Sequence, residues 1–446
     1  MEQTNKQHSF VAGRLSAMMF LEFFIWGAWY VTVGNYMAAH GMGAVIGWAY
    51  SVGPIAAIVS PFFLGMIADR FFATERVLGV LHVVGGVAMI CAPFAASALG
   101  PTAFILVLLV HMLCYMPTLG LTNSLAFHNL TDREKHFPLI RVFGTIGWIV
   151  ANVIVSLLLK ADKSALQFYV TGGVAVLMGI YSFTLPHTPP PAKGKGISLR
   201  DVLGLDSLSM LRDRNYLVFI ACSLLICMPL AAYYNYAPVF VSTAGSETPA
   251  FHMSFGQMAE IVFMLLMPLL FVRLGVKWML GVGMLAWVTR YGLFALGAPD
   301  AVWWMIMTGI ALHGICYDFF FVAGFIYCDQ KADVKIRAQA QGLLVLVTQG
   351  IGMLVGAQVS QLLVNRIVTK ELLEPPKLAK TLTALARATR IDNWRVEALL
   401  RWQSFWIIPC IAAAVVLVVF IILFRQHAGA AAAKAKEETQ TEGAGE

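Results

Sequence analysis

The sequence predicts an all-α membrane protein with twelve transmembrane helices, and two properties of the chain point to this class. Of its 446 residues, 59% are hydrophobic and only 12% are charged, whereas a soluble domain carries about 25% charged residues. The apolar residues also form long blocks, each near the ~20 residues that a helix needs to cross a bilayer. The chain therefore has too little charge for a surface that faces water.

The apolar blocks give the spans in order. The first block begins after Arg14, is longer than a signal peptide and lacks a convincing cleavage site, so we expect a retained span. The expected spans are 15–39, 45–67, 77–97, 102–126, 138–159, 165–185, 216–242, 252–272, 277–297, 302–327, 338–364 and 403–425.

Lysines and arginines gather in every second connection between these spans. By the positive-inside rule we expect those connections, and both termini, on the cytoplasmic side of the cytoplasmic (inner) membrane. The net charge is +7, but the basic residues form no single patch, which argues against nucleic acid as a partner. The basic residues concerned are Arg70, Arg76, Arg133, Lys135, Lys193, Lys195, Arg200, Arg212, Arg214, Arg273, Lys277, Lys331, Lys335 and Arg337.

One connection departs from this pattern. Residues 365–402 contain eight lysines and arginines, yet they belong outside by the count of spans. The rule is weaker for long segments, so we keep the outside location. We expect short amphipathic helices here, lying on the outer surface.

The chain divides into two halves of six spans each. The longest cytoplasmic connection, residues 186–215, is rich in proline and charge, as expected of a linker. It separates an N-terminal six-helix bundle, residues 1–185, from a C-terminal one, residues 216–425. Residues 426–446 form a low-complexity tail that we expect to be disordered.

A motif after the second span relates the two halves. Gly65, Asp69 and Arg70, with Arg76 further on, resemble the signature loop of the major facilitator superfamily. The stretch PLLFVRLGVKWML, which ends the second span of the other half, echoes it, as internal repeats of transporters do. The resemblance implies two pseudo-symmetric bundles that rock about a central site, with Gly65, Asp69 and Arg70 in a gating loop.

Three acids fall near the middle of predicted spans: Glu22, Glu260 and Asp318. A charged group there costs about 3 kcal/mol on insertion scales, and such groups mark ion and substrate pathways. Asp318 has two interpretations, a structural ion pair with Arg290 or a group that titrates on a transport path. Trp26 and Trp29 follow Glu22 at i+4 and i+7, which suits a proton site beside a stacking platform. Alternatively, Trp29 and Tyr30 belong to an aromatic belt at the membrane interface.

Polar and aromatic residues share helix faces with these acids. Gln257 lies three residues before Glu260, so the two side chains can bind one polar ligand or form a helix–helix hydrogen bond. In the fifth span a polar and aromatic stripe recurs at i, i+4, i+7 and i+11, which places it on one face. Alternatively, the side chain of Arg141, the first residue of the stripe, extends to the cytoplasmic interface. The stripe is Arg141, Thr145, Trp148 and Asn152.

Several function classes find no support. The chain shows no Walker loop, dinucleotide fingerprint, zinc spacing or nucleophile elbow, so we expect no enzyme, no cofactor and no metal. The seven cysteines have no metal-ligand spacing and we interpret them as small buried hydrophobic residues.

Nearly the whole chain resembles the nucleoside:proton symporter family, the nucleoside permeases of the major facilitator superfamily. The motifs that carry the resemblance are WGAWY, GMIADR, YMPTLGL, FPLIRVFGTIGW, QMAE, YDFF and IRAQAQG. The resemblance implies proton-coupled nucleoside uptake and a site formed by Arg141, Thr145, Gln257, Glu260, Tyr317 and Asp318, with Trp148 as a base-stacking ring. This sequence departs from the family at His313, where tyrosine is usual, at Glu22, where glutamine is usual, and in the seventh span at Ala231 and Tyr234.

We therefore expect a monomeric carrier that imports nucleosides by alternating access. Protonation of Asp318 or Glu260, with Glu22 as a further candidate, would permit substrate binding and closure. The alternative is a major facilitator carrier for another small polar solute, such as a sugar or a muropeptide fragment.

Overall fold

The computed structural model describes residues 2–63, 71–130, 133–190, 205–334, 336–369, 373 and 384–425. Throughout this described part the chain forms helices and no strand. The predicted gating loop with Gly65, Asp69 and Arg70 lies outside the described residues, as do most of the linker and the C-terminal tail.

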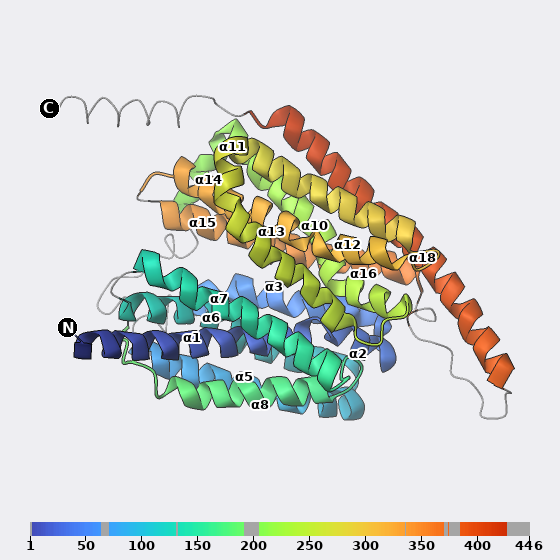
Figure 1. Ribbon diagram of the computed structural model, residues 1–446, viewed down its shortest axis with the longest axis horizontal. Helices are drawn as coiled ribbons and strands as arrows, with labels where there is room; N and C mark the ends of the chain where they lie inside the picture. Colours follow the sequence, from blue (N-terminus) through green and yellow to red (C-terminus); the bar gives the residue numbers. More distant parts are fainter. Residues whose placement is uncertain are drawn as a thin grey trace.

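The first six spans pack together as one lobe (Figure 1). α5 packs against both α6 and α8, and α1 lies along α7. The elements are α1 (Glu2–Tyr30), α2 (Val33–Ala39), η1 (Gly43–Val45), α3 (Ile46–Phe63), α5 (Thr74–Phe94), η3 (Ala95–Leu99), α6 (Pro101–Asn129), α7 (Arg133–Asn152), η4 (Val153–Leu158) and α8 (Leu166–Ser182).

The remaining spans form a second lobe, in which α18 packs against α10 and α11. Two segments of this lobe, η6 and η7, are π-helical, a geometry that frequently occurs at functional sites. The elements are η5 (Leu205–Arg212), α10 (Arg214–Thr243), α11 (Pro249–Gly297), α12 (Trp303–Ala311), α13 (His313–Tyr317), η6 (Asp318–Val322), α14 (Ala323–Lys331), α15 (Arg337–Val345), η7 (Leu346–Gly352), α16 (Met353–Ile367) and α18 (Ala384–Leu423).

The count of twelve spans is confirmed within the described residues. Ten helical segments are long and apolar enough to cross a membrane, and α8 is a shorter apolar helix. One of the ten, α11, contains two predicted spans, because Gly275 breaks the helix with φ 66° and ψ 175°. Only glycine adopts this backbone region without strain, so this residue separates the eighth span from the ninth.

The last span differs from the expectation for residues 365–402. α18 begins at Ala384 and runs without a break to Leu423, so the second half of that segment is one helix continuous with the span. The prediction of separate short helices was wrong here. Residues 384–402 contain no glycine or proline and many alanines, leucines and arginines, so nothing local ends the helix before the membrane.

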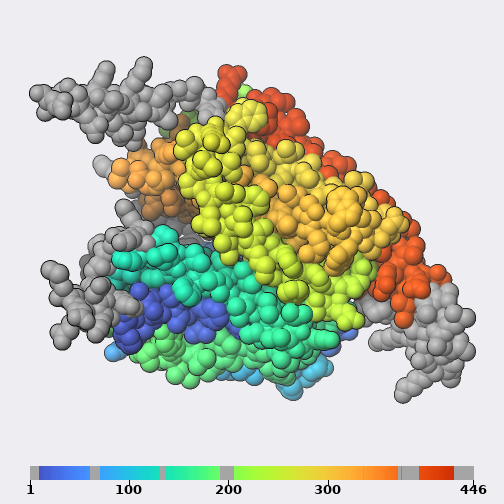
Figure 2. All heavy atoms as spheres, in the orientation of Figure 1, coloured from blue at the N-terminus to red at the C-terminus, as the bar shows by residue number. Residues whose placement is uncertain are grey.

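The two lobes contact each other mainly at one end. Gln361 of α16 accepts a hydrogen bond from the Gly47 amide (2.6 Å), and Gln358 donates to Ser51 Oγ (2.7 Å). Asp162 accepts a hydrogen bond from the Ala250 amide at the start of α11 (3.0 Å). Figure 2 shows the same meeting of lobes, with α11 against α7 and η4. These hydrogen bonds hold the two lobes together at this end.

Candidate functional site

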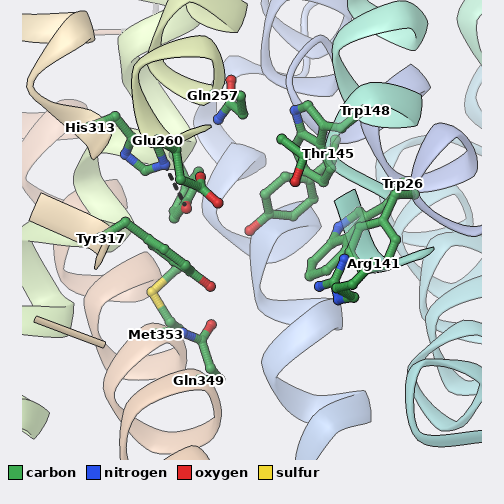
Figure 3. A pocket seen from close by; sticks show the side chains of 13 residues that line it. Trp26, Arg141, Thr145, Trp148, Gln257, Glu260, His313, Tyr317, Gln349 and Met353 are labelled. Carbon is green, nitrogen blue, oxygen red and sulfur yellow. Dashed lines mark hydrogen bonds between the residues drawn. The ribbon is translucent and has the colours of Figure 1, made fainter. Parts of the chain in front are cut away.

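A cavity of about 150 Å³ lies between the two lobes, and Figure 3 shows its lining side chains from close by. One water needs roughly 10–15 Å³ on the same measure, so the cavity has room for a small solute. Both lobes supply its walls. The lining residues are Phe23, Trp26 and Tyr30 of α1, Arg141, Thr145 and Trp148 of α7, Tyr234 of α10, Gln257 and Glu260 of α11, His313 and Tyr317 of α13, Gln349 of η7 and Met353 of α16.

The stripe predicted on the fifth span faces this cavity with three of its four members. Arg141, Thr145 and Trp148 line the wall, whereas Asn152 is buried and donates to the carbonyl oxygen of Trp148 (3.0 Å). α7 can present this face because Gly147 lets it approach α1. A Cβ atom at Gly147 would overlap the carbonyl oxygen of Phe20, so a larger residue would push the helices apart.

Arg141 lies in the cavity wall, and not at the cytoplasmic interface as its alternative interpretation required. The centre of its guanidinium group is 4.1 Å from the centroid of the Phe23 ring, which is a cation–π contact. Figure 3 shows the side chain below Trp26 on the wall formed by the first lobe. Among the described residues it forms no ion pair, so its charge is available to a solute.

Aromatic rings cover much of the same wall. Trp26 and Trp148 lie with ring centroids 5.4 Å apart and planes at 70°. Tyr30 contacts Tyr234 of the other lobe with centroids 5.9 Å apart. Rings of this kind bind flat solutes by stacking or edge contacts. The N–H groups of both tryptophans have no partner in the described part of the chain.

The second lobe contributes the acid side of the cavity. Gln257 and Glu260 both line it, as their spacing of three residues on one helix predicts. Figure 3 shows Glu260 directed toward the open centre. Neither the carboxylate of Glu260 nor Oε1 of Gln257 has a hydrogen-bond partner among the described residues, so the alternative of a helix–helix hydrogen bond is not realised.

A close helix contact fixes Glu260 beside Tyr317. A Cβ atom at Gly314 would lie 2.6 Å from the backbone nitrogen of Glu260, so α13 and α11 touch through their backbones. Tyr317, one turn along α13, then enters the cavity next to the carboxylate (Figure 3).

Asp318 follows Tyr317 but does not line the cavity. It begins the π-helical segment η6, is fully buried, and has no partner for either carboxylate oxygen in the described part of the chain. The alternative of an ion pair with Arg290 is wrong. Arg290 instead donates to the carbonyl oxygen of Gly309 (3.1 Å) and to His313 Nδ1 (3.2 Å).

Comparison with known proteins identifies the family. The family model described as "Nucleoside H+ symporter" matches residues 10–429. The chain belongs to the nucleoside H+ symporter family. It is 39% identical over 422 residues to the putative nucleoside transporter YegT of Escherichia coli (strain K12), covering 93% of both chains. It is 32% identical over 435 residues to the xanthosine permease of the same strain, covering 94% of this chain and 96% of the relative.

The fold agrees with this assignment. The crystal structure of the nucleoside transporter NupG superposes with a TM-score of 0.78 at 28% identity, covering 94% of this chain and all of the other. The symporter therefore has the major facilitator fold, is a multi-pass membrane transporter and is not an enzyme. The alternative of a carrier for sugars or muropeptide fragments is not favoured.

Glu22 occupies a different place in the symporter from the other two acids. It is buried inside the first lobe and does not line the cavity. His82 Nε2 lies 2.8 Å from one carboxylate oxygen, and Thr118 Oγ1 donates to the other at 2.6 Å. His82 is 60 residues away in the sequence, so no local pattern predicts this pair.

Several lining residues of the symporter lie beyond the sequence-based site. His313, Trp26 and Tyr234 stood out in the sequence, although they were not assigned to the site. Phe23, Tyr30, Gln349 and Met353 were missed. Gln349 and Met353 are four residues apart beside glycines that permit close helix contact, and this spacing is the one available clue to their common face.

The described residues contain no group of three or more His, Cys, Asp or Glu side chains arranged to hold a metal ion.

Proposed function

We propose that this symporter binds its nucleoside in the central cavity through Arg141, Thr145, Trp148, Gln257, Glu260 and Tyr317. The observation that carries the proposal is that one cavity combines stacking rings on one wall with an unpaired carboxylate and amide on the other. A nucleoside has the matching parts. Its flat base suits Trp148 and Trp26, and its ribose hydroxyls can donate to Glu260 and Gln257.

We further propose that Glu260 and Asp318 carry the coupled proton. Burying an ionised carboxylate without a partner is costly, so the closed states favour the protonated acid. A proton on Glu260 or Asp318 removes the charge that opposes closure of the cavity. The loaded carrier then changes its lobe orientation and releases nucleoside and proton to the cytoplasm.

Glu22 is proposed as a further proton-coupling group, acting with His82. The two side chains are buried together in the first lobe. Thr118 Oγ1 donates to the Glu22 carboxylate, and the Tyr115 hydroxyl donates to the backbone carbonyl oxygen of Glu22 (2.8 Å). A proton bound at this pair would add one positive charge beside Thr118 and Tyr115 of α6. This change is local to the first lobe.

The proposed arrangement in the membrane follows the positive-inside rule. The protein lies in the cytoplasmic membrane as a monomer with both termini in the cytoplasm. The lobe contacts through Gln361 and Asp162 then lie on the outer side. Residues 1–185 and 216–425 rock as two bodies joined by residues 186–215, and Gly65, Asp69 and Arg70 act in the gating loop.

Transport into proteoliposomes tests the proposal. Radiolabelled uridine and adenosine are supplied with and without an inward proton gradient, and we expect accumulation only with the gradient. Asp318→Asn and Glu260→Gln should abolish accumulation, while Asp318→Asn should retain exchange of internal for external nucleoside. Gradient-driven accumulation that survives both substitutions contradicts the assignment of the proton sites, and failure of a folded carrier to take up either nucleoside contradicts the proposed substrate.

A further inference from the structure

A buried cation lies directly behind the cavity wall of the second lobe. Arg290 of α11 is fully buried and forms no ion pair with a described residue. Its Nε donates to the Gly309 carbonyl oxygen (3.1 Å), and its Nη2 lies 3.2 Å from Nδ1 of His313. The centre of the guanidinium group is 4.0 Å from the centroid of the Tyr233 ring. These contacts, and not a carboxylate, compensate the buried charge.

This contact fixes the protonation of His313. A guanidinium group is always protonated and has donors but no acceptor, so Nδ1 of His313 must be the acceptor. The imidazole is then neutral and carries its hydrogen on Nε2. Its ring also stacks on Tyr233, with centroids 5.4 Å apart and planes at 19°, which holds the orientation.

The fixed hydrogen lies on the side of the ring that faces the cavity. Nε2 of His313 is 3.5 Å from the hydroxyl oxygen of Tyr234, and both side chains line the cavity. Since Nε2 can only donate, the tyrosine oxygen accepts and directs its own hydrogen elsewhere. The contact is long, so the Nε2–H group keeps most of its capacity for a solute. This part of the wall therefore offers two hydrogen-bond donors, and Arg290 prevents His313 from becoming an acceptor.

We propose that Arg290 holds His313 as a donor and that His313 and Tyr234 thereby select nucleosides whose base presents a carbonyl oxygen. An oxo group accepts both hydrogen bonds, whereas an amino group in the same place faces the Nε2–H donor of His313 and can pair only with the Tyr234 oxygen. A base without the oxygen leaves the donors unpaired in a closed cavity, which is costly. The inference rests on the proposed function and names the substrate class for that cavity. His313 and Tyr234 contact the substrate, and Arg290 is a positioning residue.

Competition binding to the purified symporter tests the inference. Inosine and purine riboside are compared because they differ at the 6-oxo group and the adjacent ring hydrogen. We expect inosine to bind on the order of tenfold more tightly than purine riboside. This factor corresponds to the free energy of one buried hydrogen bond that inosine forms and purine riboside does not. Tyr234→Phe and His313→Phe should bring the two affinities together by weakening inosine.

Tyr236→Phe is the matched control. Tyr236 lies on the same helix α10, its hydroxyl has no partner in the described part of the chain, and it does not line the cavity. The control should keep the preference for inosine. Equal affinity for both nucleosides in the unsubstituted symporter overturns the inference and leaves the proposed function intact. If the folded symporter binds neither inosine, purine riboside, uridine nor adenosine, the proposed function fails with it.

The role of Arg290 has its own readout. Nitrogen-15 spectra of histidine-labelled symporter, with the His313 signals assigned by their loss in His313→Gln, report which ring nitrogen carries the hydrogen. We expect an unprotonated Nδ1 and a protonated Nε2 in the native chain. Arg290→Met should introduce the other tautomer or the protonated ring. A native spectrum with hydrogen on Nδ1 contradicts the proposed role, whatever the variant does to folding.

Discussion

Three acids of the same chemical type have three different environments in this symporter. Glu22 is buried and paired with His82 and Thr118. Glu260 lines the cavity without a partner in the described chain, and Asp318 is buried without one. Position in a helix made all three look alike in the sequence. Because their surroundings differ, substitution of each acid should affect stability and transport differently.

Substitution of the paired acid and of the unpaired acid should have opposite effects on stability. Glu22→Leu removes the carboxylate that binds both His82 and Thr118 and leaves their buried polar groups unpaired, which should cost on the order of 3 kcal/mol. Asp318→Asn replaces a carboxylate that has no described partner by a neutral group of the same shape, so stability should be unchanged or higher. Thermal unfolding of the purified variants in detergent measures both. Equal destabilisation by the two substitutions would contradict this distinction.

At the scale of the element, the start of α10 shows how one side chain both caps a helix and joins it to another. Asp213 accepts a hydrogen bond from the Tyr216 amide (2.9 Å), the usual N-cap contact, and its other oxygen is 2.9 Å from Nζ of Lys331 on α14. Partial burial pushes the pKa of Asp213 upward, but the hydrogen bonds from Lys331 and the Tyr216 amide outweigh it and hold the pKa below its ordinary value.

Asp213→Ala should destabilise the symporter by about 1 kcal/mol at neutral pH, the usual cost of a lost cap. Because the folded-state pKa is lowered, this contribution is present above the ordinary pKa near 3.9 and is lost as the pH falls through the lowered value. Asp213→Asn serves as the control, since it keeps the cap and loses only the exposed ion pair. The measurement is the unfolding temperature at pH 7 and near pH 3, where the difference between native chain and Asp213→Ala should shrink.

Sequence reasoning was most successful where the information lies within one element. The spacing of Arg141, Thr145 and Trp148, and that of Gln257 and Glu260, gave the correct faces because helical periodicity is a local property. It failed where partners come from distant helices. The contact between Glu22 and His82 depends on how distant helices pack. So does the contact of Arg290 with His313, where the sequence had suggested an ion pair with Asp318. Such contacts produce no regular spacing of residues in the sequence.

At the scale of the whole molecule, the two lobes meet through Asp162, which lies between η4 and α8. Its side chain is buried and one oxygen accepts the Ala250 amide at the start of α11, while the other has no partner among the described residues. Burial raises the pKa of Asp162, and the hydrogen bond from Ala250 offsets only part of this rise. The Asp162 carboxylate therefore binds a proton more tightly when the lobes are in contact than when they are separated and hydrated.

The closed contact should accordingly be favoured by acid. Its contribution is fully present below the ordinary pKa of the carboxyl and is lost as the pH rises through the raised pKa. Asp162→Asn, which imitates the neutral acid, should remove this dependence. The measurement is labelling of Thr243→Cys, a buried position at the same end, by an impermeant maleimide at several external pH values, relative to the parent chain. Labelling that keeps the same pH dependence in the Asp162→Asn background would contradict the assignment.

The buried charge of Arg290 makes the movement of the lobes sensitive to the membrane voltage. It keeps its positive charge in every state, has no carboxylate partner in the described chain and belongs to a lobe inside the membrane. Membrane voltage does work of about 2.3 kcal/mol on each elementary charge moved across a drop of 100 mV. Any lobe movement that shifts Arg290 along the field therefore performs a fraction of this work. An interior-negative voltage draws the charge toward the cytoplasm, so voltage biases the orientation of the empty carrier before any nucleoside or proton has bound.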